Sequence, residues 1–294
     1  MEHYGEPDDV TQHRDWLLSL VPAPTTGLWV DLGCGKGTDM LRLAESQAQP
    51  GLRFLGIDEN RESIEAAQRS AKSDPRLEFR QHSLRAVLPL DDASVDVAFS
   101  HNLIECLADV PAFVSELARI LSPGGYVVMA HWDWDSQLFD GDDKQRNRRL
   151  VHAYCDWKQD WMEHADGWMG RRLWSIFNSS KLFDGTVLAR VLMNSRFSPE
   201  CYGYARAQDM KTLIPLGLAS DADVQSFLAD QVSLNAKDRY FYSITGYAYV
   251  ARVVKRHAVR DYGFVTSESG KVTGAAINPG RWAPSGQRIT DSKR

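Results

Sequence analysis

The sequence is poor in cysteine and has no long hydrophobic run. Its four cysteines stand far apart in 294 residues, so they form neither a C-x-x-C pair nor a disulfide framework, and we expect them to stay reduced. No segment approaches the roughly 18 to 20 apolar residues of a membrane span, and the start lacks the basic and apolar parts of a signal peptide. These absences exclude a disulfide-stapled or membrane-spanning protein and predict a cytoplasmic one.

Basic residues are not in excess either, since 34 Lys and Arg stand against 39 Asp and Glu, a net charge of −5. Proteins that bind DNA or RNA neutralise phosphates with a basic surface, so we expect no nucleic-acid partner. Hydrophobic residues are plentiful, at 43% of the chain, which is enough for the core of one elaborated domain. Residues 255–294, rich in Gly, Ser, Pro and basic side chains, lack a hydrophobic period and predict a flexible tail.

The most informative motif is Asp31-Leu-Gly-Cys-Gly-Lys-Gly37, which follows the apolar run Leu28–Val30. It predicts a buried strand that turns into a helix through a loop with glycine at every second position. Glycines let the backbone turn tightly and approach a bound molecule closely. The third glycine comes one residue too early for the G-x-G-x-x-G pattern that seats a dinucleotide pyrophosphate. The loop is therefore a cofactor site of another kind.

A second apolar strand also ends in an acidic residue, in Phe54-Leu-Gly-Ile-Asp58. Folds that bind nucleosides carry an acidic residue at about this interval after the glycine loop, and this residue accepts hydrogen bonds from the ribose diol. The two motifs together predict a cofactor that contains a nucleoside.

Four blocks resemble the class I S-adenosylmethionine-dependent methyltransferases, and the resemblance runs from about residue 16 to 254. The blocks are Val30–Thr38, Leu55–Asp58, Val95–Ile104 and Leu121–Met129, the last with a Pro-Gly-Gly turn. The resemblance implies that S-adenosylmethionine is the cofactor, that the loop glycines pass under its methionine part, and that Asp58 binds both ribose hydroxyls. Asp31 would orient the loop and the ammonium, and backbone groups of Ser83 and Leu84 would serve the adenine edge, where the family usually has an acidic residue. The expected cofactor-binding residues are Asp31, Gly33, Gly35, Gly37, Asp58, Ser83, Leu84 and His101.

Strand and helix patterns alternate up to residue 132, which predicts an α/β protein with a doubly wound, mainly parallel sheet. Residues 240–254 predict the last strand, and the resemblance implies a seven-stranded mixed sheet. The stretch 133–195 has a helical pattern and predicts a lid that binds the acceptor, inserted after the fifth strand into a core of residues 1–132 and 196–254. The other predicted elements are strands at 28–31, 52–57, 77–80, 95–100 and 125–132, and helices at 10–20, 37–47, 61–72 and 109–120.

Polar side chains near the ends of the fourth and fifth strands are the candidate bases. Methyl transfer to a phenol, an ammonium or an indole needs a His or a carboxylate to remove a proton. His101 and Glu105 follow the fourth strand, and His131 and Asp133 share one face of the fifth if that strand continues. The spacing His131-x-Asp133-x-Asp135 also suits a metal, but it implies no fourth ligand, and we expect none.

Six of the nine tryptophans fall within residues 132–174. They predict either the core of a small helical subdomain or aromatic walls around a substrate, because indole rings favour stacking and cation–π contacts. We assign Trp132, Trp134, Trp168 and Tyr202 to the acceptor. An N-terminal tyrosine, Tyr4, that folds over the sulfonium is a further hypothesis.

The sequence thus predicts an S-adenosylmethionine-dependent methyltransferase that acts on a small molecule, an aromatic or heteroaromatic, indole-like metabolite of bacterial specialised metabolism. An N-methyltransferase of a small amine is the first alternative. A non-catalytic S-adenosylmethionine-binding protein and a NAD-dependent oxidoreductase are alternatives from other classes, and the glycine spacing argues against the second. The methylated atom and the oligomeric state stay open, a homodimer included.

Overall fold

The computed structural model describes residues 8–21, 26–71, 74–85, 87–163 and 166–254. The predicted tail, 255–294, and the hypothesis on Tyr4 lie outside these residues. Among the described helices, none has the length and apolar character to cross a membrane. The four cysteines are all free thiols.

Seven strands form one mixed sheet in the order β3-β2-β1-β4-β5-β7-β6. The first five strands in the chain run parallel, and β7 runs antiparallel between β5 and β6. This arrangement confirms the predicted seven-stranded mixed sheet, and the early strands lie within a few residues of their predicted positions. The strands are β1 (Thr26–Leu32), β2 (Gly51–Asp58), β3 (Leu77–Gln81), β4 (Val95–His101), β5 (Leu121–Phe139), β6 (Phe183–Asn194) and β7 (Tyr242–Val253).

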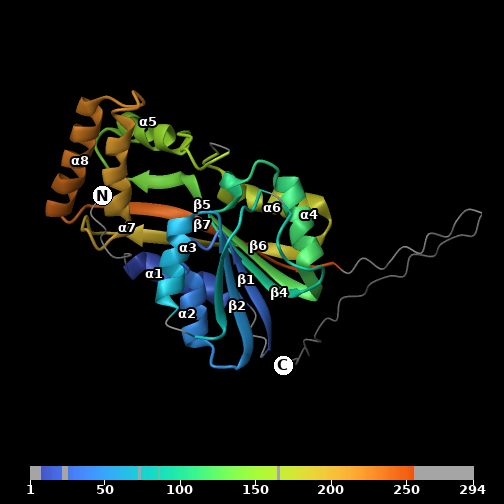
Figure 1. Cartoon of the computed structure of the whole chain (residues 1–294). Coiled ribbons are helices and arrows are strands. Elements are labelled where there is room, and N and C mark those ends of the chain that lie inside the picture. Colours follow the sequence, from blue (N-terminus) through green and yellow to red (C-terminus); the bar gives the residue numbers. More distant parts are fainter. Residues whose placement is uncertain (1–7, 22–25, 72–73, 86, 164–165, 255–294) are drawn as a thin grey trace, which may run out of the picture. The chain divides into compact units, whose positions relative to one another are not determined.

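Helices cover both faces of the sheet, because successive strand side chains point to opposite sides. Trp29 and Val30 are both buried in neighbouring positions of β1, yet they belong to two different hydrophobic clusters. One cluster lies under α1, α2 and α3, the other under α4 and α6 (Figure 1). These helices are α1 (Asp8–Ser19), α2 (Thr38–Ser46), α3 (Arg61–Ser70), α4 (Val110–Ile120) and α6 (Met169–Ser180).

A group of helices beside the far end of β5 has a hydrophobic cluster of its own, which includes Leu150, Met210, Leu213, Val224 and Phe227. We call this group the helical lobe; it lies at the upper left of Figure 1. The strand β5 reaches it because it continues past the predicted end at residue 132 to Phe139. The lobe consists of α5 (Lys144–Cys155), α7 (Tyr202–Asp209), the 3-10 turn η2 (Met210–Leu213) and α8 (Asp221–Ala236).

The prediction that residues 133–195 are helical is wrong at both ends of that range. The first residues of the range belong to β5. Residues 183–194 form β6, which pairs with β7 over its whole length. The strand β6 lies at the edge of the sheet, with Leu188, Val191 and Met193 exposed, so its apolar residues do not alternate with polar ones as they do in a half-buried strand. The role of this range as an acceptor-binding lid stays a prediction.

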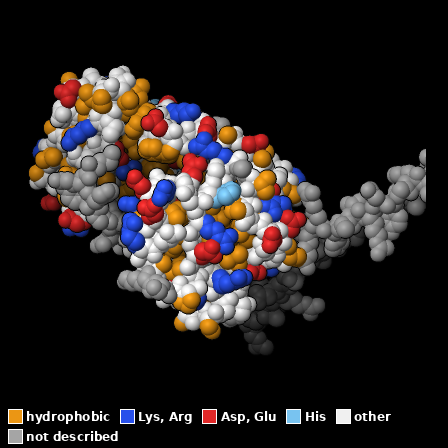
Figure 2. All heavy atoms as spheres, viewed as in Figure 1, with side chains coloured by type: hydrophobic (Ala, Val, Ile, Leu, Met, Phe, Trp, Pro, Cys, Tyr) orange, Lys and Arg blue, Asp and Glu red, His pale blue; other side chains and the backbone are white. Residues whose placement is uncertain are grey.

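The surface is hollowed between the helical lobe and the sheet in the space-filling view (Figure 2). Acidic and basic side chains are interspersed on the face shown there. The carboxyl ends of β1, β2 and β4 lead to a cavity, and the residues around it are described next.

Candidate functional site

The glycine loop connects β1 to α2 in the predicted place, and its three glycines have φ of +78° (Gly33), +52° (Gly35) and +76° (Gly37). Only glycine adopts such angles without strain. A Cβ on Gly37 would lie 2.5 Å from the ring of Phe79, so this glycine lets α2 approach β3. A Cβ on Gly35 would have no heavy atom within 4 Å. The backbone at Gly35 therefore borders open space, as a loop that cradles a ligand should.

Asp58 ends β2 and holds the loop. Its two carboxylate oxygens accept hydrogen bonds from the backbone N–H of Gly35 and of Asn60, both at 2.8 Å. A carboxylate offers about four lone-pair sites, so each oxygen keeps one for a ligand.

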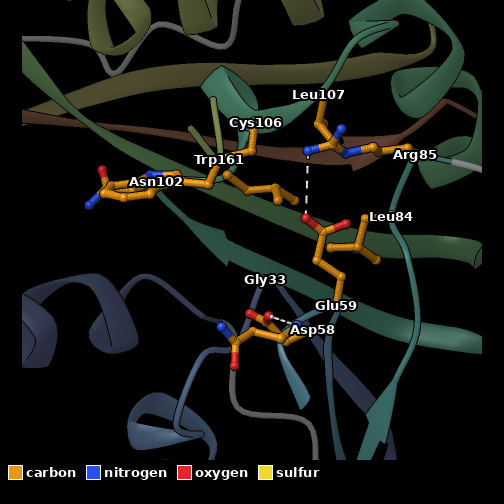
Figure 3. Close-up of a pocket in the computed structure, with 11 residues that line it drawn as sticks. Gly33, Asp58, Glu59, Leu84, Arg85, Asn102, Cys106, Leu107 and Trp161 are labelled. Atoms are coloured by element: carbon orange, nitrogen blue, oxygen red, sulfur yellow. Dashed lines mark hydrogen bonds and ion pairs between the residues drawn. The ribbon is translucent and has the colours of Figure 1, made fainter. Parts of the chain in front are cut away.

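A cavity of about 600 Å³ opens beside Asp58 (Figure 3). Three predicted cofactor residues, Gly33, Asp58 and Leu84, line it, whereas Asp31, Gly35, Gly37, Ser83 and His101 are not among its walls. The remaining wall residues were missed by sequence reasoning. Some carried a signal, since Asn102 and Leu103 lie in the block Val95–Ile104 and Trp161 is one of the six clustered tryptophans. These residues are Glu59, Asn60, Arg85, Asn102, Leu103, Cys106, Leu107 and Trp161.

Asp31 is buried beneath the loop, at the end of β1. Burial raises the pKa of its carboxyl well above the usual range, and the charges of Asp39 and Asp58 raise it further, against Arg14. Arg14 itself lies 2.7 Å from Asp39. Burial and the neighbouring carboxyls thus disfavour the Asp31 anion, and a ligand with a cationic group would stabilise it.

His131 and Glu105 face each other in the interior, where their side chains are 0% and 7% exposed. Nδ1 of His131 lies 2.7 Å from the carbonyl oxygen of Trp132. A carbonyl only accepts, so Nδ1 carries the proton and Nε2 of the neutral ring holds a lone pair. That Nε2 is 3.7 Å from Oε2 of Glu105 and has no hydrogen-bond partner within the described part of the chain. Burial raises the pKa of Glu105, while the His131 charge and the Trp134 indole lower it.

Asp133 is fully buried and bound to Arg171 at the start of α6. Its Oδ2 accepts from the backbone N–H of Arg171 at 3.2 Å and from Nε at 2.6 Å, and its Oδ1 accepts from Nη2. The helix comes this close because Gly170 has no side chain; a Cβ there would lie 2.9 Å from the Asp133 nitrogen. Asp133 therefore anchors α6, and its predicted role as a catalytic base stays a prediction.

Asp133 and Asp135 both lie beside the guanidinium of Arg171, and His131 faces Glu105, so the three side chains do not form one set of metal ligands. Asp135 instead accepts a hydrogen bond from the indole of Trp168 at 2.7 Å. Within the described residues, no group of three or more His, Cys, Asp and Glu is placed to hold a metal ion.

The four aromatic residues assigned to the acceptor have different surroundings. Trp132 is buried and stacked between His13 and Tyr202, with ring centroids at 4.0 and 5.5 Å. Trp168 is about half exposed, and Arg171 and Arg172 lie over its ring, so its contacts are explained without a ligand.

Trp134 is the strongest candidate for the acceptor wall. It is half-buried, and its indole N–H lies near the carboxylate of Glu105, whose pKa it lowers, without a hydrogen bond of regular geometry. Its ring lies near Tyr154, and Arg206 lies over both Trp134 and Tyr202. No local sequence pattern predicts an arginine at this position.

His101 ends β4 on the side of the sheet that carries α1. Its ring lies 5.7 Å from that of His13 and 5.9 Å from that of Trp132. Burial lowers the pKa of His101 well below its usual value, and the charges of Arg14, His13 and His131 lower it further. His101 is thus kept neutral, and its predicted contact with the cofactor stays a prediction.

The chain matches the protein family described as "Methyltransferase domain" over residues 28–205. It is 32% identical over 156 residues to an uncharacterized 37.1 kDa protein in transposon TN4556 of Streptomyces fradiae, which covers 53% of this chain and 45% of that protein. It is 34% identical over 122 residues to trans-aconitate 2-methyltransferase of Azoarcus sp. (strain BH72). This match covers 42% of this chain and 46% of that protein. The chain thus spans about half the length of these curated relatives.

The fold is shared with solved structures at low sequence identity. The crystal structure of YcgJ from Bacillus subtilis superposes on this chain with a TM-score of 0.55 and a sequence identity of 17%. The superposition covers 84% of this chain and all of YcgJ. At this identity the likeness concerns the fold alone.

Proposed function

Since the chain belongs to the methyltransferase family, the class I S-adenosylmethionine-dependent group that its motifs resemble, we propose that it transfers a methyl group from S-adenosylmethionine to a small-molecule acceptor. The observation that carries the proposal is the cavity of about 600 Å³ lined by Gly33 and Asp58. It lies outside the carboxyl ends of the parallel strands, where such sheets bind their ligands.

The residues present fit this cofactor. Asp58 keeps lone pairs for two ribose hydroxyls, and the backbone at Gly35 borders open space in which a ligand can pass. The buried carboxyl of Asp31 favours a cationic group such as the cofactor's ammonium. When bound, S-adenosylmethionine supplies an electrophilic methyl group on a sulfonium.

His131 is the proposed general base. Because Nδ1 donates to a backbone carbonyl, the lone pair of Nε2 is held in one direction and can take a proton from an acceptor O–H or N–H. Glu105, next to that nitrogen, then stabilises the imidazolium that forms. Both groups are buried, so their interaction is weakened little by water.

An aromatic or heteroaromatic acceptor fits the surroundings of Trp134 best. Trp134, Tyr154 and Tyr202 offer ring faces against which a flat acceptor can stack. Arg206, which lies over Trp134 and Tyr202, is paired with Asp209 at 2.8 Å, so this pair offers no unpaired carboxylate to a charged amine. The similarity to trans-aconitate 2-methyltransferase supports a small acceptor.

Calorimetric titration with S-adenosylmethionine, S-adenosylhomocysteine and NAD, without an acceptor, tests the cofactor. We expect micromolar binding of the two sulfur compounds and none of NAD. Binding of NAD alone, or of none of the three, would contradict the proposal.

An acceptor screen with phenols, indoles and amines tests the transfer. We expect release of S-adenosylhomocysteine together with the mass gain of one methyl group on a ring-containing acceptor. Cofactor binding without turnover on any acceptor would favour the non-catalytic alternative.

A further inference from the structure

Trp161 has an unusual place for a large apolar side chain. It is 57% exposed, yet it is one of the walls of the cofactor cavity. It belongs to neither a helix nor a strand, and comes from the connection between α5 and α6, outside all four blocks of family resemblance. An exposed aromatic ring at the mouth of a cavity indicates a ligand contact rather than a packing role.

The segment that carries Trp161 is fixed to the cavity at its end. The backbone N–H of Glu163 donates to the carbonyl oxygen of Glu105 at 3.0 Å. The carboxylate of Glu163 pairs with Arg85, whose guanidinium also lies 3.5 Å from Glu59 on the opposite wall. Figure 3 shows the Arg85–Glu59 pair spanning the cavity, with Trp161 on the side of Cys106. The segment is thus tied to two loops, one through Glu105 and one through Arg85, at a residue only two positions after Trp161.

The cavity walls divide by polarity. Asp58 and Asn60 are polar and suit a ribose, whereas Leu84, Leu103 and Leu107 are apolar and suit a flat base. Burial raises the pKa of the Cys106 thiol to about 12, which keeps it neutral and part of the apolar side. A purine whose ribose is bound to Asp58 would lie among these side chains, with one face toward the opening.

We propose that Trp161 covers the purine ring of the bound cofactor, and that the Arg85–Glu163 ion pair holds this segment closed over it. The inference rests on the proposed function, because it takes the cavity to bind a nucleoside cofactor. It assigns part of the cofactor site to the connection between α5 and α6, so release of the cofactor requires that segment to move.

The test compares Trp161→Ala with Trp161→Phe by calorimetric titration of S-adenosylhomocysteine without an acceptor. Loss of the ring should weaken binding about tenfold, and phenylalanine should restore most of it. The matched control is Trp174→Ala, because Trp174 is also about half exposed, on α6, and is not among the cavity walls. This control should bind like the wild type.

Unchanged binding by Trp161→Ala, when the wild type binds, overturns the inference and leaves the proposed function intact. Absence of binding by the wild type overturns both. A Trp174→Ala variant as weak as Trp161→Ala also overturns the inference, since the effect is then general to the loss of an exposed tryptophan.

The ion pair is tested separately through the rate of dissociation of S-adenosylhomocysteine. Both side chains are partly exposed, so Glu163→Gln should speed dissociation only about two- to fivefold. Added salt should speed dissociation from the wild type and have less effect on the variant. Equal rates and equal salt dependence in the two proteins overturn the role of this pair.

Discussion

His131 combines a buried position with a lone pair that no described residue uses, and this makes it the residue to change first. We predict that His131→Gln lowers kcat by roughly 10²- to 10⁴-fold, the usual contribution of a general base. Binding of S-adenosylhomocysteine should stay within about twofold, because His131 is not a wall of the cofactor cavity. Steady-state kinetics and calorimetry measure the two effects.

A surface histidine serves as the control for that experiment. The side chain of His152 is 62% exposed, and His152→Gln should keep full activity. If His131→Gln also keeps full activity and an unchanged pH profile, another group removes the proton, or the acceptor needs no base.

His13 predicts a pH dependence of stability. Burial, helped by the charges of Arg190 and Arg14, lowers its pKa to about 3, so between pH 6.5 and 3 the unfolded chain binds a proton that the folded protein does not. Stability therefore falls as the pH falls through this window. From pH 7 to 5 the loss due to His13 is about 2 kcal/mol.

The variant His13→Phe isolates this contribution, because it keeps a ring against Trp132 without a titrating group. Urea unfolding at pH 7 and pH 5 should show a smaller loss of unfolding free energy in the variant than in the wild type. Equal losses would mean that His13 is not the group responsible.

At the scale of residues, the site residues that belong to a local sequence motif were predictable. Gly33 and Asp58 were predictable because the glycine loop and the acidic strand end are each contained in a few consecutive residues. Trp161 and Arg85 were not, since they reach the cavity only through the path of the chain between distant elements. The ion pair of Asp133 was not predictable, because a sequence does not reveal that Arg171, 38 positions later, binds its carboxylate.

At the scale of elements, the contact of α6 with β5 predicts an asymmetry between two variants. Arg171→Met leaves a fully buried carboxylate without its cation, which should cost about 3 kcal/mol of unfolding free energy. Asp133→Asn leaves an arginine that is 40% exposed and can be hydrated, so it should cost less, about 1 kcal/mol. Chemical denaturation measures both, and a reversed order would contradict this account of the anchor.

Elements with one buried face were predictable, and the edge strand β6 was not. The strands β1, β2, β4 and β5 carry runs of buried apolar residues, and the helices α2, α3 and α4 bury one side each. In β6 the burial alternates with a break at Leu188 and Ala189, but apolar residues also stand at exposed positions, so the residue types show no period of two. Its position is determined by pairing with β7, which is a contact between distant parts of the chain.

At the scale of the whole molecule, ligand binding should raise the thermal stability by mass action. S-adenosylhomocysteine at about 100 times its Kd contributes about 2.7 kcal/mol, which corresponds to a rise in Tm of roughly 5 to 10 °C. Asp58→Asn should abolish most of this rise, because the amide cannot accept from both ribose hydroxyls. A variant with the same ligand-induced shift as the wild type would remove Asp58 from the cofactor site.

The separate hydrophobic cluster of the helical lobe has a consequence for how this protein can change. The lobe has its own cluster and is joined to the sheet by a further one, in which Tyr202 of α7 and Leu234 of α8 pack with Trp132 and Tyr242, while α1 to α4 and α6 pack on the sheet elsewhere. Exchanges within α5, α7 and α8 should therefore alter the preference for the acceptor at little cost to cofactor binding. In evolution or in a designed library, residues of the helical lobe can vary, whereas the sheet and the glycine loop must be kept.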